Sequence, residues 1–341
     1  MSRLRVSPLA GLALLAASTA LFSAPALATP KVVATLKPIH SLTAAVMEGV
    51  GSPDLLIQGA ASPHDFALKP SQAGLLQDAD LVIWVGEALE TSLAKPIEAL
   101  TGEARVLELM EAPGLTLLEF RESDDWGHDD HAHGDEAHEH EHEDHGKDAH
   151  ADGAHEDEAA SEGAHEHHHE GLDPHVWLSP DNARAMTAAI AARLAELDPE
   201  NAATYQANAS ALETQLAALK DEIAAQVAPA RETGMIAFHD AYHYFEESFD
   251  LHFQAAVAPR PEVQSGAESL SHLKDLIASE GTRCLFTEPQ FTPKRVQLLQ
   301  DGTGLKVGTL DPLGADLADG PGLYPQLLRN MASAIADCAA N

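Results

Sequence analysis

The chain alternates between short apolar runs and longer segments of helical character. Runs such as residues 32–36 and 80–86 are almost entirely apolar, which indicates strands buried on both faces, as in a parallel sheet. Predicted strands cover residues 32–36, 54–57, 80–86, 105–109, 234–238, 282–286 and 306–310. Predicted helices cover residues 41–49, 70–79, 89–100, 181–197, 199–227, 240–249, 266–279, 293–302 and 322–338. This repeated strand–loop–helix order predicts two α/β lobes, each a mostly parallel sheet with helices on both faces.

Two helix starts and one long helix shape this prediction. Residues 37–40 are expected to end the first strand, so that Ser41 caps the next helix. Ser179 followed by Pro180 predicts the start of the helix at 181–197. The helix from Pro199 to about Val227 would span roughly 40 Å at about 1.5 Å per residue. Because that is longer than one small lobe, we expect it to brace the two lobes.

The first 28 residues have the pattern of a secretory signal peptide. Arg3 and Arg5 precede a short apolar stretch at 12–21, and a small-residue cleavage site ends at Ala28. The apolar stretch is too short to cross a bilayer of about 30 Å. The sequence therefore predicts cleavage after Ala28 and export of a soluble protein.

These signals together predict the organisation of the chain. The signal peptide occupies residues 1–28, and an N-terminal α/β lobe covers 29–180. Helices that include the link occupy 181–228, and a C-terminal α/β lobe covers 229–341. The chain contains two cysteines, Cys284 and Cys338, and in an exported protein such a pair favours a disulfide over two buried thiols.

Residues 124–170 form an insert of extreme composition, with 18 Asp and Glu, one Lys and 13 His. The insert contains no Val, Ile, Leu, Met or Phe, so it cannot bury a core and is expected to stay disordered without metal. Its histidines are candidate weak, exchangeable metal ligands; the alternative is a purely solubilising acidic linker. These histidines are His128, His131, His133, His138, His140, His142, His145, His150, His155, His165, His167, His168 and His169.

The formal net charge of the whole chain is −34, and the insert contributes half of it. Nucleic acid and anionic membrane surfaces both require a basic face on the protein that binds them. The charge therefore argues against both partners and fits the attraction of cations.

Candidate metal ligands cluster where predicted strands end. In open α/β sheets, ligands bind beyond the carboxyl ends of the strands, and imidazole suits zinc. The residues that follow strand ends are His40, His64, His239, Glu288 and Asp311, and His175 follows the insert directly. Each also has a plainer interpretation, as a solvated loop residue, a core histidine or, for the two carboxylates before proline, a backbone cap. The pattern predicts that three or four of these side chains meet in one cleft between the lobes.

Five segments carry a resemblance to a known family. Four of them contain Pro63-His64-Asp65, Asp173-Pro174-His175, Phe238-His239-Asp240 and Thr287-Glu288-Pro289, and the fifth is residues 309–314. The chain resembles the periplasmic zinc-binding proteins of bacterial zinc ABC transporters, the ZnuA type, in this order and over essentially the whole mature chain. An insert rich in His and acidic residues is itself typical of that group.

The resemblance implies a zinc ion in the cleft, bound by His64, His175 and His239, and a Cys284–Cys338 disulfide. Some relatives carry a Glu directly before the first ligand, where this chain has Pro63. That leaves Asp311, a water molecule or His40 as the fourth ligand, with Glu288 as a less favoured candidate. Manganese-binding relatives have a carboxylate in place of the third histidine, so His239 favours zinc.

The function expected from these features is capture of Zn²⁺ in the periplasm and its delivery to the integral-membrane permease of an ABC transporter. The protein would act as a monomer and would catalyse no reaction. One alternative is a zinc hydrolase, since a catalytic zinc also uses three protein ligands and would take Glu288 as its base. The other alternative is a zinc-dependent adhesin or a metal store.

Overall fold

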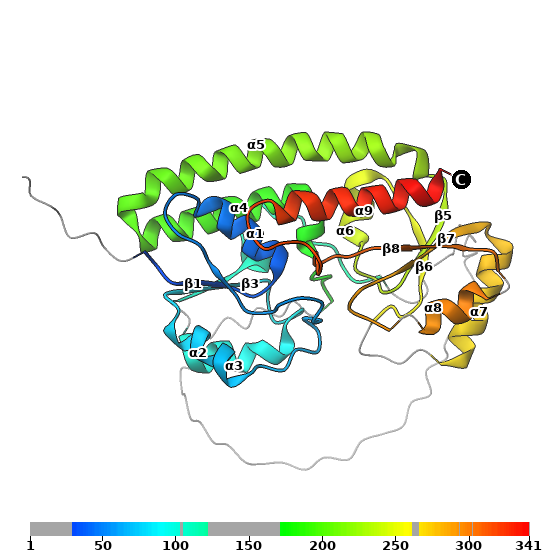
Figure 1. The fold of residues 1–341 in the computed structure, drawn as a ribbon, viewed down its shortest axis with the longest axis horizontal. Helices are drawn as coiled ribbons and strands as arrows, with labels where there is room; N and C mark the ends of the chain where they lie inside the picture. Colours follow the sequence, from blue (N-terminus) through cyan, green and yellow to red (C-terminus); the bar gives the residue numbers. More distant parts are fainter. Residues whose placement is uncertain are drawn as a thin grey trace, which may run out of the picture.

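Two four-stranded sheets, both entirely parallel, form the centre of the molecule (Figure 1). The computed structural model describes residues 29–102, 105–121, 171–260, 266–292, 294–301 and 303–340. The first sheet has the order β2-β1-β3-β4, with β1 Val32–Ala34, β2 Asp54–Leu55, β3 Leu81–Trp84 and β4 Val106–Glu108. The second has the order β6-β5-β7-β8, with β5 Gly234–Ala237, β6 Phe253–Ala256, β7 Thr282–Thr287 and β8 Lys306–Thr309. The predicted pair of α/β lobes is confirmed.

Helices cover both faces of each sheet, which explains why β1 and β3 are buried along their whole length. On one side of the first sheet lie α1 Lys37–Val46, α4 Pro180–Leu197 and α5 Ala202–Val227 (Figure 1). On the other lie α2 Pro70–Asp78 and α3 Thr91–Thr101. The second lobe contains α6 His243–Phe249, α7 Ala267–Ser279, α8 Lys294–Gln300 and α9 Leu323–Ala339.

Two helices, and not one, connect the lobes. The predicted long helix is α5, which packs against α1 and α4 in the first lobe and against α6 in the second. The last helix, α9, runs beside α5 and also packs against both α1 and the second sheet (Figure 1). The backbone N–H of Tyr324 at the start of α9 donates to Oγ of Ser41, 2.9 Å away. At the other end of α9, Cys338 forms the predicted disulfide with Cys284 of β7.

Two elements differ from the sequence-based prediction. The first helix begins at Lys37 and not at Ser41, because Pro38 falls in its first turn, where the missing N–H of proline costs nothing. Strand β6 was not predicted, since Gln254 and the two alanines after it lack the branched side chains typical of strands. It forms because it pairs in parallel with β5. By contrast, Ser179 caps α4 as predicted and accepts a hydrogen bond from the backbone N–H of Asn182.

Among the described helices, none combines the length and the apolar content needed to cross a membrane. The predicted signal peptide at 1–28 and the predicted disorder of the insert at 124–170 both lie outside the described residues.

Candidate metal centre

Three predicted candidates meet in the structure. Each of His64, His175 and His239 offers one ring nitrogen, and these three atoms lie within 4.8 Å of one another. In the part of the chain that the structure describes, no other group of three or more His, Cys, Asp or Glu side chains does so. His175 and His239 are each only 3% exposed, whereas His64 is half-buried.

The three histidines come from different parts of the fold, and the topology of the second sheet explains the position of His239. His64 lies in the loop after β2, and His175 directly precedes the short 3₁₀ helix Val176–Leu178. His239 follows β5 and Glu288 follows β7, the two central strands whose connections leave in opposite directions. Ligands of open α/β sheets bind beyond the strand ends at such a switch point. Both residues therefore lie at the position where a binding site is expected.

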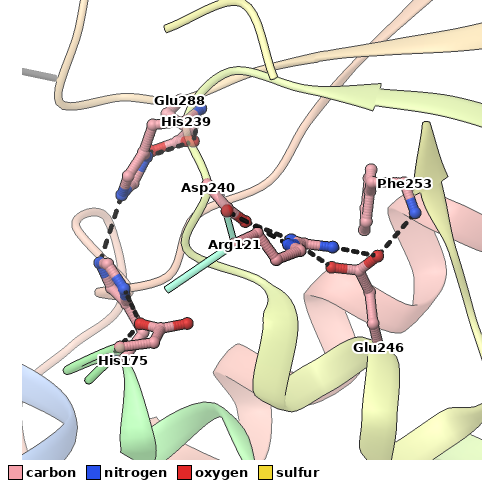
Figure 2. A network of polar contacts seen from close by, with 8 residues as sticks. Arg121, His175, His239, Asp240, Glu246, Phe253 and Glu288 are labelled. Atoms are coloured by element: carbon pink, nitrogen blue, oxygen red, sulfur yellow. Dashed lines mark hydrogen bonds and ion pairs between the residues drawn. The ribbon is translucent and has the colours of Figure 1, made fainter. Parts of the chain in front are cut away.

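Each of the two buried histidines is held by one carboxylate. Oδ1 of Asp173 accepts from the backbone N–H of His175, 2.9 Å away, and also lies 2.7 Å from Nδ1 of its ring. Oε1 of Glu288 accepts from the backbone N–H of His239, 3.2 Å away, and lies 2.7 Å from Nδ1 of that ring (Figure 2). A carboxylate oxygen in this setting accepts, so Nδ1 of each ring carries the proton.

As a consequence, Nε2 of His175 and Nε2 of His239 both present a lone pair. The two atoms are 3.4 Å apart and point toward each other (Figure 2). When both rings are neutral their two lone pairs repel, and a proton or a metal ion between the two nitrogens relieves this repulsion. Zn–N bonds of about 2.0–2.1 Å place two nitrogens of a tetrahedral site roughly 3.4 Å apart. The spacing of the two rings therefore fits zinc.

Burial and charge act differently on the two buried rings. Burial lowers the pKa of His175 well below its usual value, and the nearby His239 and His64 lower it further. Burial also acts to lower the pKa of His239, but the carboxylates of Glu288, Asp240 and Asp173 together outweigh it, so the net pKa is raised. Burial raises the pKa of Asp173 to about 7. His175 is therefore held neutral, the form in which imidazole binds a metal.

The other candidates do not join the three histidines. His40 lies inside α1, where its Nε2 is 3.1 Å from the carbonyl oxygen of Pro53. Glu288 forms hydrogen bonds with the backbone and the ring of His239. Asp311, one of the candidates for the fourth ligand, organises its own loop in this structure: Oδ1 accepts from the N–H groups of Leu313 and Gly314, and Oδ2 from that of Ala315. A carboxylate with this many partners caps a turn, which is the plainer interpretation of Asp before Pro.

A second polar network lies beside the site and had no signal in the sequence. Arg121, at the edge of the insert, pairs with Asp240, the residue after His239, and its Nη2 lies 2.7 Å from Oε2 of Glu246 (Figure 2). Oε1 of Glu246 accepts from the backbone N–H of Phe253, 2.6 Å away. Both carboxylates are buried, and burying a charge is costly unless the charge is paired. Asp173 was missed in the same way, although it stands two residues before His175.

The three histidines line a cavity of about 490 Å³. Its lining includes all three histidines together with Phe120 and Gly171, the residues on either side of the insert. The backbone N–H of Phe120 donates to the carbonyl oxygen of Gly171, 2.7 Å away, so these two flanking residues lie side by side at this cavity.

Comparison with known proteins places this arrangement in a family. The model of the zinc-uptake complex component A family, periplasmic (ZnuA), matches residues 32–338. This chain belongs to the ZnuA family. The resemblance predicted from the five sequence segments is thus confirmed.

Relatives in the ZnuA family match over nearly their whole length. The high-affinity zinc uptake system protein ZnuA of Brucella abortus (strain 2308) is 47% identical over 308 residues, which cover 90% of this chain and 91% of the relative. The protein of the same name from Yersinia pestis is 35% identical over 312 residues, with 92% of each chain covered. A crystal structure of ZnuA superposes with a TM-score of 0.69 at 23% identity and covers 91% of this chain and 99% of that one, which confirms the fold.

Proposed function

We propose that this chain captures Zn²⁺ and delivers it to the membrane permease of an ABC transporter for zinc uptake. The observation that carries the proposal is the pair of Nε2 atoms of His175 and His239, 3.4 Å apart, with His64 within ligand distance. Three neutral imidazoles form a site that suits zinc. Relatives that match over nine-tenths of the chain bear the name of high-affinity zinc uptake proteins, which supports the same function.

Binding and release suffice for this role, so no catalytic step is proposed. A zinc hydrolase would need a general base within reach of the metal-bound water. Glu288 was the candidate; its Oε1 accepts hydrogen bonds from the ring and the backbone of His239, while its Oε2 is buried without a hydrogen-bond partner among the described residues. Its position favours a role in orienting a ligand, as carboxylates beside metal-binding histidines commonly have.

The cellular setting is proposed from the sequence. The pattern of residues 1–28 supports export with cleavage after Ala28, and the family is described as periplasmic. We take the mature chain to work as a monomer with an N-terminal lobe at 29–180, linking helices at 181–228 and a C-terminal lobe at 229–341. The insert histidines are proposed as secondary zinc ligands that gather the ion near the cleft, because the flanking residues Phe120 and Gly171 both line the cavity.

The test is a ligand substitution in a chain that lacks residues 124–170. The hydrogen bond between Phe120 and Gly171 keeps the two ends together, so the remaining residues can close a short turn. In this background, His175→Ala is expected to weaken zinc binding by more than the about 10–100-fold typical of losing an outer partner of a ligand. His252→Ala, at an exposed histidine outside the site, is the matched control and should bind like the parent.

Competition with a chromogenic zinc chelator measures both affinities. Unchanged zinc affinity in His175→Ala would show that the cleft is not the zinc site. An equal loss in both variants would point to general damage to the fold, which circular dichroism of the zinc-free proteins would reveal.

A further inference from the structure

The turn between β3 and α3 forms part of the wall of the cavity of about 490 Å³. Ala88, Leu89 and Thr91, at the end of this turn and the start of α3, line the cavity together with His64. Glu90 stands among them in the sequence, yet it is completely buried, with 0% of its surface exposed. A fully buried carboxyl group is uncommon, because burying its charge without a cation is costly.

One oxygen of the Glu90 carboxyl group holds the backbone of the turn. Oε2 accepts from the N–H of Val85, 2.8 Å away, and from that of Gly86, 3.3 Å away. The backbone N–H of Glu90 in turn donates to the carbonyl oxygen of Gly86, 3.0 Å away. Glu90 therefore fixes the course of the chain where it leaves β3.

The other oxygen of this carboxyl group lacks a donor. Oε1 of Glu90 is buried and accepts no hydrogen bond within the described part of the chain. The neighbouring side chain is that of Thr35, whose hydroxyl group donates to the carbonyl oxygen of Ile83, 3.4 Å away. The hydroxyl oxygen of Thr35 can still accept a hydrogen bond. A proton on Oε1 would use that acceptor, whereas an ionised carboxylate would leave Oε1 buried and unpaired.

The charged groups that act on this turn are other carboxylates. Glu108 on β4 lies against Gly86, where an added Cβ would come within 2.5 Å of its Oε1. Burial raises the pKa of Glu90 to about 7. Burial, together with the charges of Glu111, Glu90 and Glu87, also raises the pKa of Glu108 to about 7. Two carboxylates that contact one glycine repel each other, which favours a proton on one of them.

We propose that Glu90 is a proton-dependent latch on the cavity wall. With its proton, the neutral carboxyl group donates through Oε1 to Thr35 and accepts the two backbone N–H groups through Oε2, so the turn 85–90 is held against the sheet. Loss of the proton leaves a buried charge among carboxylates, and the turn loosens. The cavity wall is then held firmly at acidic pH and less firmly at alkaline pH. The latch does not depend on zinc, so it stands or falls apart from the proposed function.

Glu90→Gln tests the latch, because the amide is uncharged and can form the same hydrogen bonds as the protonated carboxyl group. A raised pKa means that the folded chain keeps a proton that the unfolded chain has released. The parent should therefore lose stability as the pH rises from 4.5, the ordinary value, to about 7, and lose no more above that. Glu90→Gln should melt like the parent near the lower limit and at a clearly higher temperature near pH 8.

Glu98→Gln, at an exposed position on α3, is the matched control and should melt like the parent at every pH. Many histidines titrate in the same range, but all three chains share them, so a comparison at each pH removes their contribution. A difference between Glu90→Gln and the parent that does not change with pH would overturn the latch. A melting temperature of Glu90→Gln below that of the parent at pH 8 would do so as well.

Hydrogen exchange in the unmodified chain decides the question even if Glu90→Gln folds poorly. The protection of the N–H groups of Val85 and Gly86 should fall as the pH passes through about 7, after correction for the intrinsic exchange rate. The N–H of Ile83, within β3, is the internal reference and should keep its protection. Protection that changes in parallel at all three positions would contradict the latch.

Discussion

Arg121 forms an ion pair with Asp240, the residue that directly follows the candidate ligand His239. The two are 119 positions apart in the chain, and Arg121 lies at the edge of the His-rich insert. The same guanidinium also pairs with the buried carboxylate of Glu246. Arg121 therefore ties the first lobe, at the point where the insert leaves it, to the part of the second lobe that carries His239.

Replacing Arg121 with Met should strongly destabilise the protein. The substitution keeps the apolar part of the side chain but leaves Asp240 and Glu246 buried without their cation. Breaking a buried pair in this way costs about 3–5 kcal/mol. Arg329→Met is the matched control, because its pair with Glu222 is exposed and screened by solvent, so its loss should change stability little. Urea unfolding of both variants measures the difference, and equal losses would show that the Arg121 network is not a stabilising one.

The dependence of zinc binding on pH should be set by His239 and not by His175. Zinc binds only the unprotonated ring, and a raised pKa means that a ring takes up its proton at higher pH as the solution is acidified. Burial and the neighbouring histidines hold the pKa of His175 well below its usual value, whereas nearby carboxylates, Glu288 foremost among them, hold that of His239 above it. Affinity should therefore be full above the raised pKa of His239 and fall by about tenfold per pH unit below it.

Glu288→Gln tests this assignment. The amide can still accept from Nδ1 of His239 but no longer stabilises the protonated ring, so zinc should be retained to lower pH than in the parent. Glu222→Gln, which removes an exposed carboxylate from the surface pair with Arg329, should leave the profile unchanged. Chelator competition between about pH 5 and 8 covers the range in which histidine titrates. A profile of Glu288→Gln that coincides with the parent would contradict the role of His239.

The sequence predicted most of the fold because the relevant signals are local. Uniformly apolar runs marked β1 and β3, and Ser179 with Pro180 marked the start of α4. Strand β6 was missed because its four residues gain their stability from pairing with β5 and not from their own preference. The course of α9 across both lobes likewise depends on packing between distant segments, such as the contact of Tyr324 with Ser41.

The three histidines were predicted because each follows an element end or lies in a family motif, and such positions are visible in the sequence. The role of Asp311 could not be predicted, since a carboxylate before proline can face a cleft or cap its own loop. Only the folded chain shows that the loop at 313–315 and Gln290 take its oxygens. Arg121 pairs across the lobes, and no spacing in the sequence marks such a contact.

The disulfide should contribute substantially to stability. It joins Cys284 and Cys338 across a sequence separation of 54 residues and attaches α9 to β7. For a loop of this length, the entropic model gives about 4 kcal/mol of stabilisation. The double variant Cys284→Ser/Cys338→Ser should lose about that much in urea unfolding. Alkylation and mass spectrometry of the unreduced protein should detect no free thiol, and two freely alkylated cysteines would contradict the assignment.

Removal of the insert should reduce the number of bound zinc ions without removing the tightest one. The 13 histidines of residues 124–170 lie among acidic and small residues without a fixed geometry encoded in the sequence. Each zinc bound there must order chain at a cost in entropy, so these sites should be weaker than the cleft. Because Phe120 and Gly171, which flank the insert, both line the cavity, zinc held by the insert should stay near the cleft at raised effective concentration.

Calorimetry distinguishes this gathering role from that of a primary site. The full chain should bind several zinc ions, and the chain without residues 124–170 should bind one tightly. A third variant, with the 13 insert histidines changed to Gln, keeps the length and the acidic charge of the insert and separates the effect of imidazole from that of charge. It should show the single tight event and few of the weaker ones. If the tight event disappears with the insert, the insert is the primary site and the three histidines of the cleft are not.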